Sequence, residues 1–250
     1  MGSQLKFVKM EGLGNDFVLV GPEVNVDGDL VRRLCDRRRG VGADGLLHVS
    51  SSNGVVVMGY WNADGSTAEM CGNGLRCVAR YAFDEGLAAD AEFDVVTPAG
   101  SRRVEVSDQP RVETGPTSVS TPFLFENRDF LPVRVGNPHA VTIVGDVGAT
   151  DVAGIGARLE AATPQGVNVE FVRVADRSQL EMRVWERGVG ETLACGSGMV
   201  AAVAAANHLG LVDEVVTVRV PGGEGEVALA DDTSWLTGPA RYVFGGETFL

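Results

Sequence analysis

Two cysteines attract attention because the same short motif follows each of them. The chain contains Cys71-Gly72-Asn73-Gly74 and, further along, Cys195-Gly196-Ser197-Gly198. Each motif opens a stretch of helical composition, and a tryptophan precedes each cysteine at the same spacing. A cysteine at the start of a helix lies in the positive end of the helix dipole, which favours its thiolate. We therefore expect two matching halves that contribute one thiol each.

Two such thiols on opposite sides of a carbon atom could carry out a proton exchange, one as base and one as acid. The glycines after each cysteine leave backbone N–H groups open to an anion such as a carboxylate. The alternative, a small buried core residue, is disfavoured for Cys71 and Cys195 because the motif is repeated. Cys35 and Cys77 lack that motif, so we expect them in the core.

Several polar residues are further candidates for ligand contacts. Asparagine is common in turns because it tolerates a left-handed backbone, so each one alone favours a structural role. Matching places in a duplicated chain instead favour binding for Asn15, Asn62, Asn137 and Asn168. Arg187 beside Glu186 could clamp a carboxylate or form a surface ion pair. His139 alone would more often be structural.

The elements that must position these residues are mostly short strands. We expect helices at 29–38, 75–83, 155–159 and 199–209, with Gly86 as a left-handed cap. Alternating or apolar runs predict strands at 5–10, 17–20, 46–49, 55–61, 93–97, 103–106, 131–135, 140–144, 166–172, 180–185, 215–220, 225–229 and 241–244. The stretch 108–122 has no clear period and predicts the domain boundary.

Landmarks other than the cysteines support an internal duplication. Gly14-Asn15 and Gly136-Asn137 precede their cysteines at nearly equal spacings, as do Gly40-Val41 and Gly166-Val167. We expect each half to be mostly antiparallel β-structure with one main helix.

Composition excludes several classes of function. The chain has 250 residues, 44% of them hydrophobic, and a net charge of −13 that argues against nucleic acids and anionic membranes as partners. It has no apolar run of roughly 20 residues, and its start, Met1-Gly2-Ser3-Gln4, lacks signal-peptide features, so we expect a cytoplasmic protein. Three histidines and the cysteine spacing argue against a metal site.

The balance of charges has two interpretations. Lys6 and Lys9 are the only lysines, and acids outnumber bases by 34 to 21. This balance fits a halophilic protein, solvated in high salt. The alternative is ordinary solubility combined with GC-rich coding.

Taken together, the motifs resemble the diaminopimelate epimerase family. The matching blocks follow the family order over nearly the whole chain. They are Gly12-Leu13-Gly14-Asn15-Asp16-Phe17, Asn62-Ala63-Asp64-Gly65-Ser66, Glu69-Met70-Cys71-Gly72-Asn73-Gly74-Leu75-Arg76-Cys77, Gly136-Asn137-Pro138-His139, Gly166-Val167-Asn168, and the run from Trp185 to Gly198.

The resemblance implies an α+β fold of two pseudo-symmetric domains, each a curved, mainly antiparallel sheet wrapped around a central helix. It places the active site in the cleft between them. The N-terminal half would comprise residues 1–114 plus 240–250, with a last strand near Arg241 to Phe249, and the C-terminal half residues 115–239. It also implies epimerisation of LL- to meso-diaminopimelate in lysine biosynthesis, a small-molecule substrate, no cofactor and a homodimer.

The resemblance further implies roles for individual residues. Cys71 would be the proton donor and Cys195 the proton acceptor, with His139 and Glu186 tuning the thiols. The family's substrate contacts map onto Asn15, Asn62, Gly72, Asn73, Asn137, Asn168, Glu186, Arg187, Gly196 and Ser197.

The sequence departs from the family pattern at three positions, and other functions compete. Gly45 stands where the family often has Gln, Glu11 where it has His, and Ser197 where it has Thr. A proline-racemase or hydroxyproline-epimerase type of enzyme would share the two-cysteine mechanism, but its substrates lack a distal carboxylate for Arg187. A phenazine-biosynthesis type of isomerase would not need both cysteines. A binding protein without activity is the non-enzyme alternative.

Overall fold

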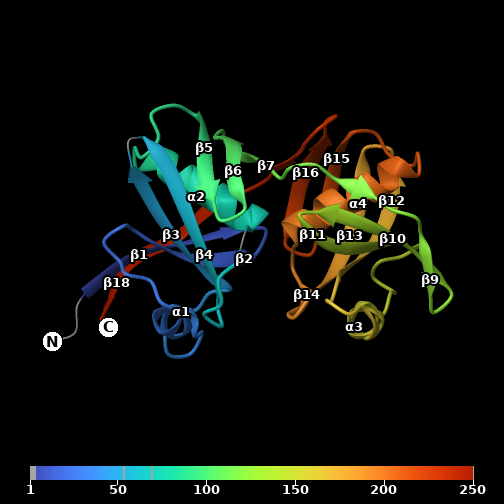
Figure 1. The fold of residues 1–250 in the computed structure, drawn as a ribbon, viewed down its shortest axis with the longest axis horizontal. Coiled ribbons are helices and arrows are strands. Elements are labelled where there is room, and N and C mark those ends of the chain that lie inside the picture. The colour runs from blue at the N-terminus through green and yellow to red at the C-terminus, as the bar shows by residue number, and fades with distance from the viewer. Residues whose placement is uncertain (1–3, 53, 69, 250) are drawn as a thin grey trace. The chain divides into compact units, whose positions relative to one another are not determined.

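The structure, a computed structural model, describes residues 4–52, 54–68 and 70–249, so Glu69 of the sequence motif and residues 1–3 lie outside it. The chain divides into two compact units (Figure 1). One comprises Met1–Val112 with Gly238–Leu250, and the other comprises Glu113–Thr237. Each unit is a sheet-dominated α+β domain with few helices.

The first unit is built on a sheet in the order β18-β1-β2-β3-β4-β5-β6-β7. The pairs β2–β3 and β4–β5 are parallel, and the other neighbours are antiparallel. The strands are β1 (Gln4–Gly12), β2 (Asn15–Val20), β3 (Gly45–Ser52), β4 (Val55–Asn62), β5 (Glu92–Thr97), β6 (Gly100–Glu105), β7 (Arg111–Glu113) and β18 (Arg241–Phe249).

Two helices accompany this sheet. Helix α1 (Gly28–Cys35) begins at Asp27, whose carboxylate accepts from the Leu30 backbone N–H at 2.8 Å. It ends at Cys35 and not at residue 38 as expected, because the Asp36 carboxylate binds the next backbone N–H groups in a turn. Helix α2 (Gly72–Asp84) packs against β1, β2, β3, β4 and β6, and Gly86 after it is left-handed, as predicted.

The second unit has a sheet in which β10-β11-β12-β13-β15-β16-β17 are successive neighbours. Strands β8 and β9 both pair with β10, and β14 pairs with β13. The bounds are β8 (Ser118–Val119), β9 (Phe123–Phe125), β10 (Arg128–Val135), β11 (Asn137–Ile143), β12 (Asn168–Asp176), β13 (Gln179–Glu186), β14 (Gly190–Thr192), β15 (Val215–Val220), β16 (Gly223–Leu229) and β17 (Ser234–Thr237).

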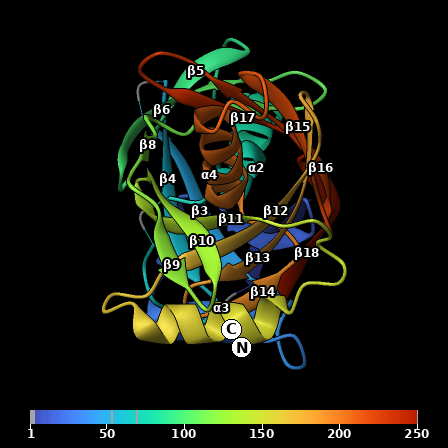
Figure 2. The same ribbon diagram turned by 90° about the vertical axis from the view of Figure 1, so that its right-hand side faces the viewer.

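The helices of the second unit are α3 and α4. Helix α4 (Gly196–His208) is enclosed by strands of its sheet, and its residues from 198 to 206 are buried (Figure 2). Helix α3 (Val152–Ala162) packs on β12, β13 and β14, and it is longer than the five residues expected. Within the described ranges, each unit therefore holds one longer helix, α2 or α4, and one shorter helix, α1 or α3, as expected from the sequence.

The two units share the same arrangement of seven consecutive sheet strands. The run β1 to β7 has the same order of parallel and antiparallel pairs as β10 to β13 followed by β15 to β17. Asn15 and Asn137 open equivalent strands, each after a glycine with positive φ. The internal duplication expected from sequence is thus present in the fold.

One landmark of the duplication was matched wrongly. Phe17 pairs with Gly45, and the equivalent His139 pairs with Asn168, so Gly45 and Asn168 correspond. Gly166-Val167 therefore match residues 43–44 and not Gly40-Val41. The reason is that the connection between α1 and β3 is longer than that between α3 and β12.

The expected strands are present, but several short ones were missed. The stretch 108–122, expected to be irregular, contains β7 and β8, and β9, β14 and β17 were not foreseen. These strands have two to four residues, too few to show a period, and they form because distant partners supply their hydrogen bonds. Within the described ranges, no helix has the length and apolar character needed to cross a membrane.

Helix α3 depends on a glycine to approach β13. A Cβ atom at Gly156 would lie 2.5 Å from both Cβ and Cγ of Trp185. We expect Gly156→Ala to lower the free energy of unfolding by about 1–2 kcal/mol, because overpacking outweighs the gain in helix propensity. Urea denaturation measures this. Gly145→Ala is the control, since that position has open space around it; an equal effect in both variants would contradict the prediction.

Candidate active site

Cys71 is the N-cap residue of α2. Its backbone is extended (φ −138°, ψ 118°), and its Sγ accepts from the Gly74 backbone N–H at 3.5 Å. Helix α2 starts close against the sheet because Gly74 has no side chain; a Cβ there would lie 3.2 Å from Leu47 and 3.5 Å from Phe17. The half-buried thiol is thereby held at the opening of the helix.

Asn15 and Asn73 join Cys71. The thiol of Cys71 donates to Asn15 Oδ1 at 3.6 Å, and Asn73 Nδ2 donates to the same oxygen at 3.4 Å. Asn15 Nδ2 in turn donates to Asp44 Oδ2 at 2.7 Å. Asp44 was not singled out from the sequence, although it stands beside Gly45.

Asn62 and Gly45 are paired across β3 and β4. Asn62 Nδ2 donates to Ser66 Oγ at 3.0 Å. A Cβ at Gly45 would lie 2.6 Å from the Trp61 carbonyl oxygen and 2.8 Å from the Tyr60 ring. The place that a longer side chain would need at position 45 is therefore filled by Tyr60.

Cys195 is the N-cap residue of α4, and it is buried (6% exposed). Its Sγ lies 3.6 Å from Ser197 Oγ, and the Glu186 carboxyl group is a close neighbour that acts on it electrostatically. Gly198 allows the close approach of α4, because a Cβ there would lie 2.8 Å from Glu170 Oε1 and 3.4 Å from Cys195 Sγ. The two thiols thus have the same place in the backbone and different neighbours.

A buried imidazole–carboxylate pair lies beside Cys195. His139 Nδ1 is 2.6 Å from Glu170 Oε1, and His139 Nε2 is 2.9 Å from Asn137 Oδ1. Both His139 and Glu170 are at most 1% exposed. Sequence reasoning found His139 and missed Glu170, whose signal was a carboxylate inside the apolar run from Val169 to Val172.

Burial dominates the electrostatics of this half. It raises the pKa of Cys195 well above its usual value, and the charges of Glu186 and Glu170 add to that rise. Burial also raises the pKa of Glu186, against hydrogen bonds from Thr192 and Cys195 that lower it. It raises the pKa of Glu170 against the opposing charge of His139. Burial therefore favours the protonated forms of Cys195, Glu186 and Glu170.

Asn168 and Arg187 are joined by a backbone contact. Asn168 Oδ1 accepts from the Arg187 backbone N–H at 3.0 Å, and Asn168 Nδ2 donates to the Pro138 carbonyl at 3.1 Å. The exposed Arg187 guanidinium donates to the Gln165 carbonyl at 3.3 Å. Asn168 thus fixes the backbone at Arg187 and leaves its side chain near a surface pocket.

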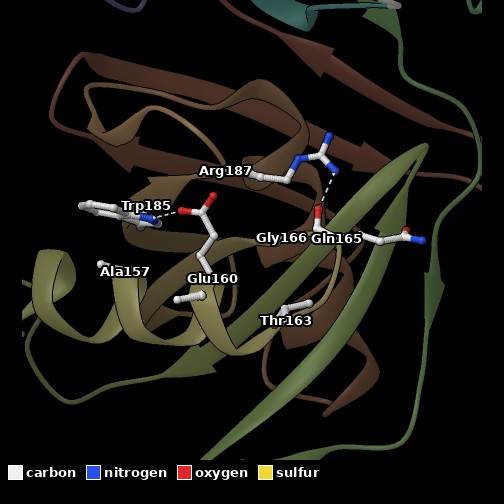
Figure 3. Close-up of a pocket in the computed structure, with 8 residues that line it drawn as sticks. Ala157, Glu160, Thr163, Gln165, Gly166, Trp185 and Arg187 are labelled. Atoms are coloured by element: carbon white, nitrogen blue, oxygen red, sulfur yellow. Dashed lines mark hydrogen bonds between the residues drawn. The ribbon is translucent and has the colours of Figure 1, made fainter.

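That pocket, of about 490 Å³, is shown in Figure 3. It is lined by Ala157, Glu160, Ala161, Thr163, Gln165, Gly166, Trp185 and Arg187. Glu160 accepts from Trp185 Nε1 and from the Gly188 backbone N–H, each at 2.7 Å. Glu160 therefore ties α3 to the turn that carries Arg187, a role that the sequence did not indicate.

The predicted residues gather into two groups, one in each unit. The first unit brings together Asn15, Cys71 and Asn73 at the start of α2, with Gly72 in its first turn, while Asn62 faces Ser66. The second unit brings together Asn137, His139, Glu186, Cys195 and Ser197 at the start of α4, with Gly196 in its first turn and Asn168 beside Arg187.

Fold and site together define a class: duplicated α+β proteins in which each half presents one cysteine at a helix N-terminus. Solved structures of this fold include a phenazine biosynthesis protein of the PhzF family from Bacillus anthracis (TM-score 0.76, 13% identity, 99% of this chain and 100% of that one). Another is a hydroxyproline epimerase from Agrobacterium vitis (TM-score 0.74, 15% identity, 100% and 94%). At such identities the likeness concerns the fold alone.

The sequence comparisons are more specific. The family model for diaminopimelate epimerase matches residues 7–120 and 132–243. Diaminopimelate epimerases from Xanthomonas campestris and Moorella thermoacetica are each 40% identical, over 98% and 97% of this chain and 96% and 99% of theirs. That of Corynebacterium glutamicum is 41% identical over 99% of both chains. The chain belongs to the diaminopimelate epimerase family.

None of the four cysteines, all of which lie in the described ranges, forms a disulfide bond, and their surroundings predict unequal reactivity. Burial raises the pKa of Cys35 to about 11 and that of Cys77 to about 12, and it raises that of Cys195 well above its usual value. At pH 8 these three therefore remain thiols, and the half-buried Cys71 should react first with iodoacetamide. Peptide mapping at partial modification measures this. Labelling of Cys195 as fast as Cys71 would contradict it.

Proposed function

We propose that the protein is a diaminopimelate epimerase that interconverts the LL and meso isomers without a cofactor. The observation that carries this proposal is the pair of N-cap thiols, Cys71 and Cys195, in a chain of that family. The reaction exchanges the hydrogen on one α-carbon from one face to the other. It needs a base on one face and an acid on the other.

In the proposed mechanism, Cys195 is the proton acceptor. Its thiol first gives its proton to the neighbouring Glu186 carboxylate, the group whose charge acts on it. The resulting thiolate removes the α-proton of the substrate, which leaves a carbanion. Cys71, as the proton donor, protonates that carbanion on the opposite face and becomes a thiolate. In the reverse direction the two thiols exchange roles.

The helix N-termini supply the stabilisation that the carbanion requires. An α-proton next to a carboxylate is weakly acidic, so negative charge on that carboxylate must be stabilised in the transition state. The backbone N–H groups of Gly72, Asn73, Gly196 and Ser197 lie in the first turns of α2 and α4 and have no partner within the helix. We assign them to the reacting carboxylate.

We assign binding of the distal end of the substrate to other residues. Arg187 offers an exposed guanidinium on a turn fixed by Asn168 and Glu160, which suits a second carboxylate. Asn15, Asn62 and Asn137 are assigned to the remaining polar groups of diaminopimelate. Proline and hydroxyproline lack a second carboxylate, so Arg187 supports diaminopimelate over them.

The cellular setting is also part of the proposal. The product is a precursor in lysine biosynthesis, and we place the enzyme in the cytoplasm as a homodimer. The net charge of −13 with two lysines suits a protein that works in high salt.

The activity test is proton NMR of the reduced protein with LL-diaminopimelate in D2O, at low and high salt. We expect loss of the α-proton signal and appearance of the meso isomer. Cys71→Ala and Cys195→Ala should each lower epimerisation by about 1,000-fold or more, because each removes one acid–base group. The controls are Cys35→Ala and Cys77→Ala, which change buried thiols outside the site. Exchange with proline alone would point to the competing function.

The pH dependence of the epimerase activity should report the ionisation of Glu186. Burial raises its pKa above the usual value for a carboxyl group, and only the ionised form can take the proton from Cys195. Activity should therefore fall as the pH drops through this raised pKa. We expect Glu186→Gln to lower kcat by about 100-fold and to remove this acid limb. An acid limb that persists unchanged in Glu186→Gln would refute the role.

A further inference from the structure

Two equivalent asparagines stand beside the two thiol sites. Asn15 is the first residue of β2 and Asn137 the first residue of β11, each after a left-handed glycine. From duplication alone, the two amide groups would be expected to have the same orientation. Their hydrogen bonds show that the two orientations differ.

In the first unit, a carboxylate fixes the amide of Asn15. Arg37 donates to Asp44 Oδ1 at 2.7 Å, and the Asp44 carboxylate oxygens can only accept. Asp44 Oδ2 accepts from Asn15 Nδ2 at 2.7 Å. The Asn15 oxygen must therefore face the other way, toward Asn73 Nδ2 and the thiol of Cys71.

In the second unit, an imidazole fixes the amide of Asn137. Burial raises the pKa of Glu170 and favours its protonated carboxyl group, which can donate to His139 Nδ1 across their 2.6 Å contact. His139 Nε2 then carries the imidazole hydrogen and donates to Asn137 Oδ1 at 2.9 Å. The Asn137 oxygen is thus anchored, and its Nδ2 has no acceptor among the described residues.

Each anchor exists in one half only. Val167 stands just before β12, where Asp44 stands just before β3. Phe17 is the third residue of β2, where His139 is the third residue of β11. Likewise Leu47 in β3 takes the place of Glu170 in β12. Apolar residues cannot anchor an amide, so the two orientations are encoded by different residues.

We propose that Asp44 and Glu170 are positioning residues that hold the equivalent amides of Asn15 and Asn137 in opposite orientations. Asp44 turns an amide oxygen toward Cys71, while Glu170, through His139, turns the amide N–H groups of Asn137 outward. The proposal deepens the proposed function and rests on it for the assignment of the acid and the base.

The opposite orientations make the halves chemically unequal. A carbonyl oxygen accepts a hydrogen bond from a thiol and repels a thiolate, so Asn15 stabilises the protonated form of Cys71. This agrees with Cys71 as the proton donor. The outward N–H groups of Asn137 suit an anion, such as a substrate carboxylate.

Other ionisable groups lie near Cys71 as well. Arg76 and Cys77 of α2 interact electrostatically with it, and Glu11 of β1 acts on both of them. Asp44, just before β3, is joined to Cys71 through Asn15. A test of Asn15 must therefore separate its orientation from simple changes of charge.

The first experiment measures the pH dependence of Cys71 alkylation by iodoacetamide, in a Cys195→Ser background. In Asp44→Asn, the new side-chain oxygen should face Arg37 and its NH2 group should face Asn15, so that the Asn15 amide turns and presents N–H to Cys71. We expect Cys71 alkylation at neutral pH to become about ten-fold faster, one pKa unit. Asp44→Glu, which keeps the carboxylate, should resemble the parent protein.

Asp16→Asn is the matched control. It removes the same charge from the same Arg37 partner, and the Asp16 side chain, which also pairs with Lys9 and accepts from the Asp44 backbone N–H, has no hydrogen bond to Asn15. An unshifted profile in Asp44→Asn, or an equal shift in Asp16→Asn, would overturn the assignment of Asp44. If Asp44→Asn does not fold, Asn15→Ala removes the oxygen directly, and an unshifted profile there would overturn it too. Neither readout needs epimerase activity, so failure of the proposed function would be recognised separately.

The second experiment concerns Glu170 and compares KM values for diaminopimelate. Glu170→Leu introduces the residue type that the first unit has at the equivalent position, Leu47, and leaves His139 Nδ1 without its partner. In Glu170→Gln, the side-chain amide can still donate to His139 Nδ1. We expect the KM of Glu170→Leu to exceed that of Glu170→Gln by about ten-fold, with thermal unfolding as the check on folding. Equal KM values would overturn the role of Glu170.

Discussion

The structure depends on the close approach of two helix N-termini to their sheets. At Gly74 and Gly198 a single added carbon atom would meet side chains of β3 and β12 within about the contact distance of van der Waals neighbours or less. Glycine at these positions lets α2 and α4 begin against the strands, with Cys71 and Cys195 as N-cap residues. Any larger residue would push the helix away and would move the thiol with it.

The two halves share this backbone arrangement, but the strand side chains beside the helix N-termini differ between them. The third residues of β3 and β12 are Leu47 and Glu170, and each lies beside the glycine of its helix. An apolar neighbour and a buried carboxylate leave the thiols in the same position with different proton affinities. The two halves therefore share one fold but place different side chains around their thiols. This difference suits a reaction that needs an acid on one face and a base on the other.

Much of the fold and of the candidate site could be predicted from the sequence. The features that were missed share a physical reason. The cysteine motifs, the long strands and the duplication are local or repeated signals, and they are confirmed by the fold. Asp44, Glu160 and Glu170 were missed because their roles come from partners 25 to 31 residues away, set by strand register and helix packing. The short strands escaped for the same reason. Gly40-Val41 was mismatched because spacing along a chain ignores loop length.

The pairing of β18 with β1 has a consequence for synthesis on the ribosome. The first unit contains the first residues of the chain and also its last strand, which pairs with β1 from Gln4 to Glu11. The second unit, residues 113–237, is complete before β18 emerges. Domains fold as units during translation, so the unit that begins first keeps an open sheet edge at β1 until β18 has emerged. The second unit can therefore complete its sheet before the first unit does.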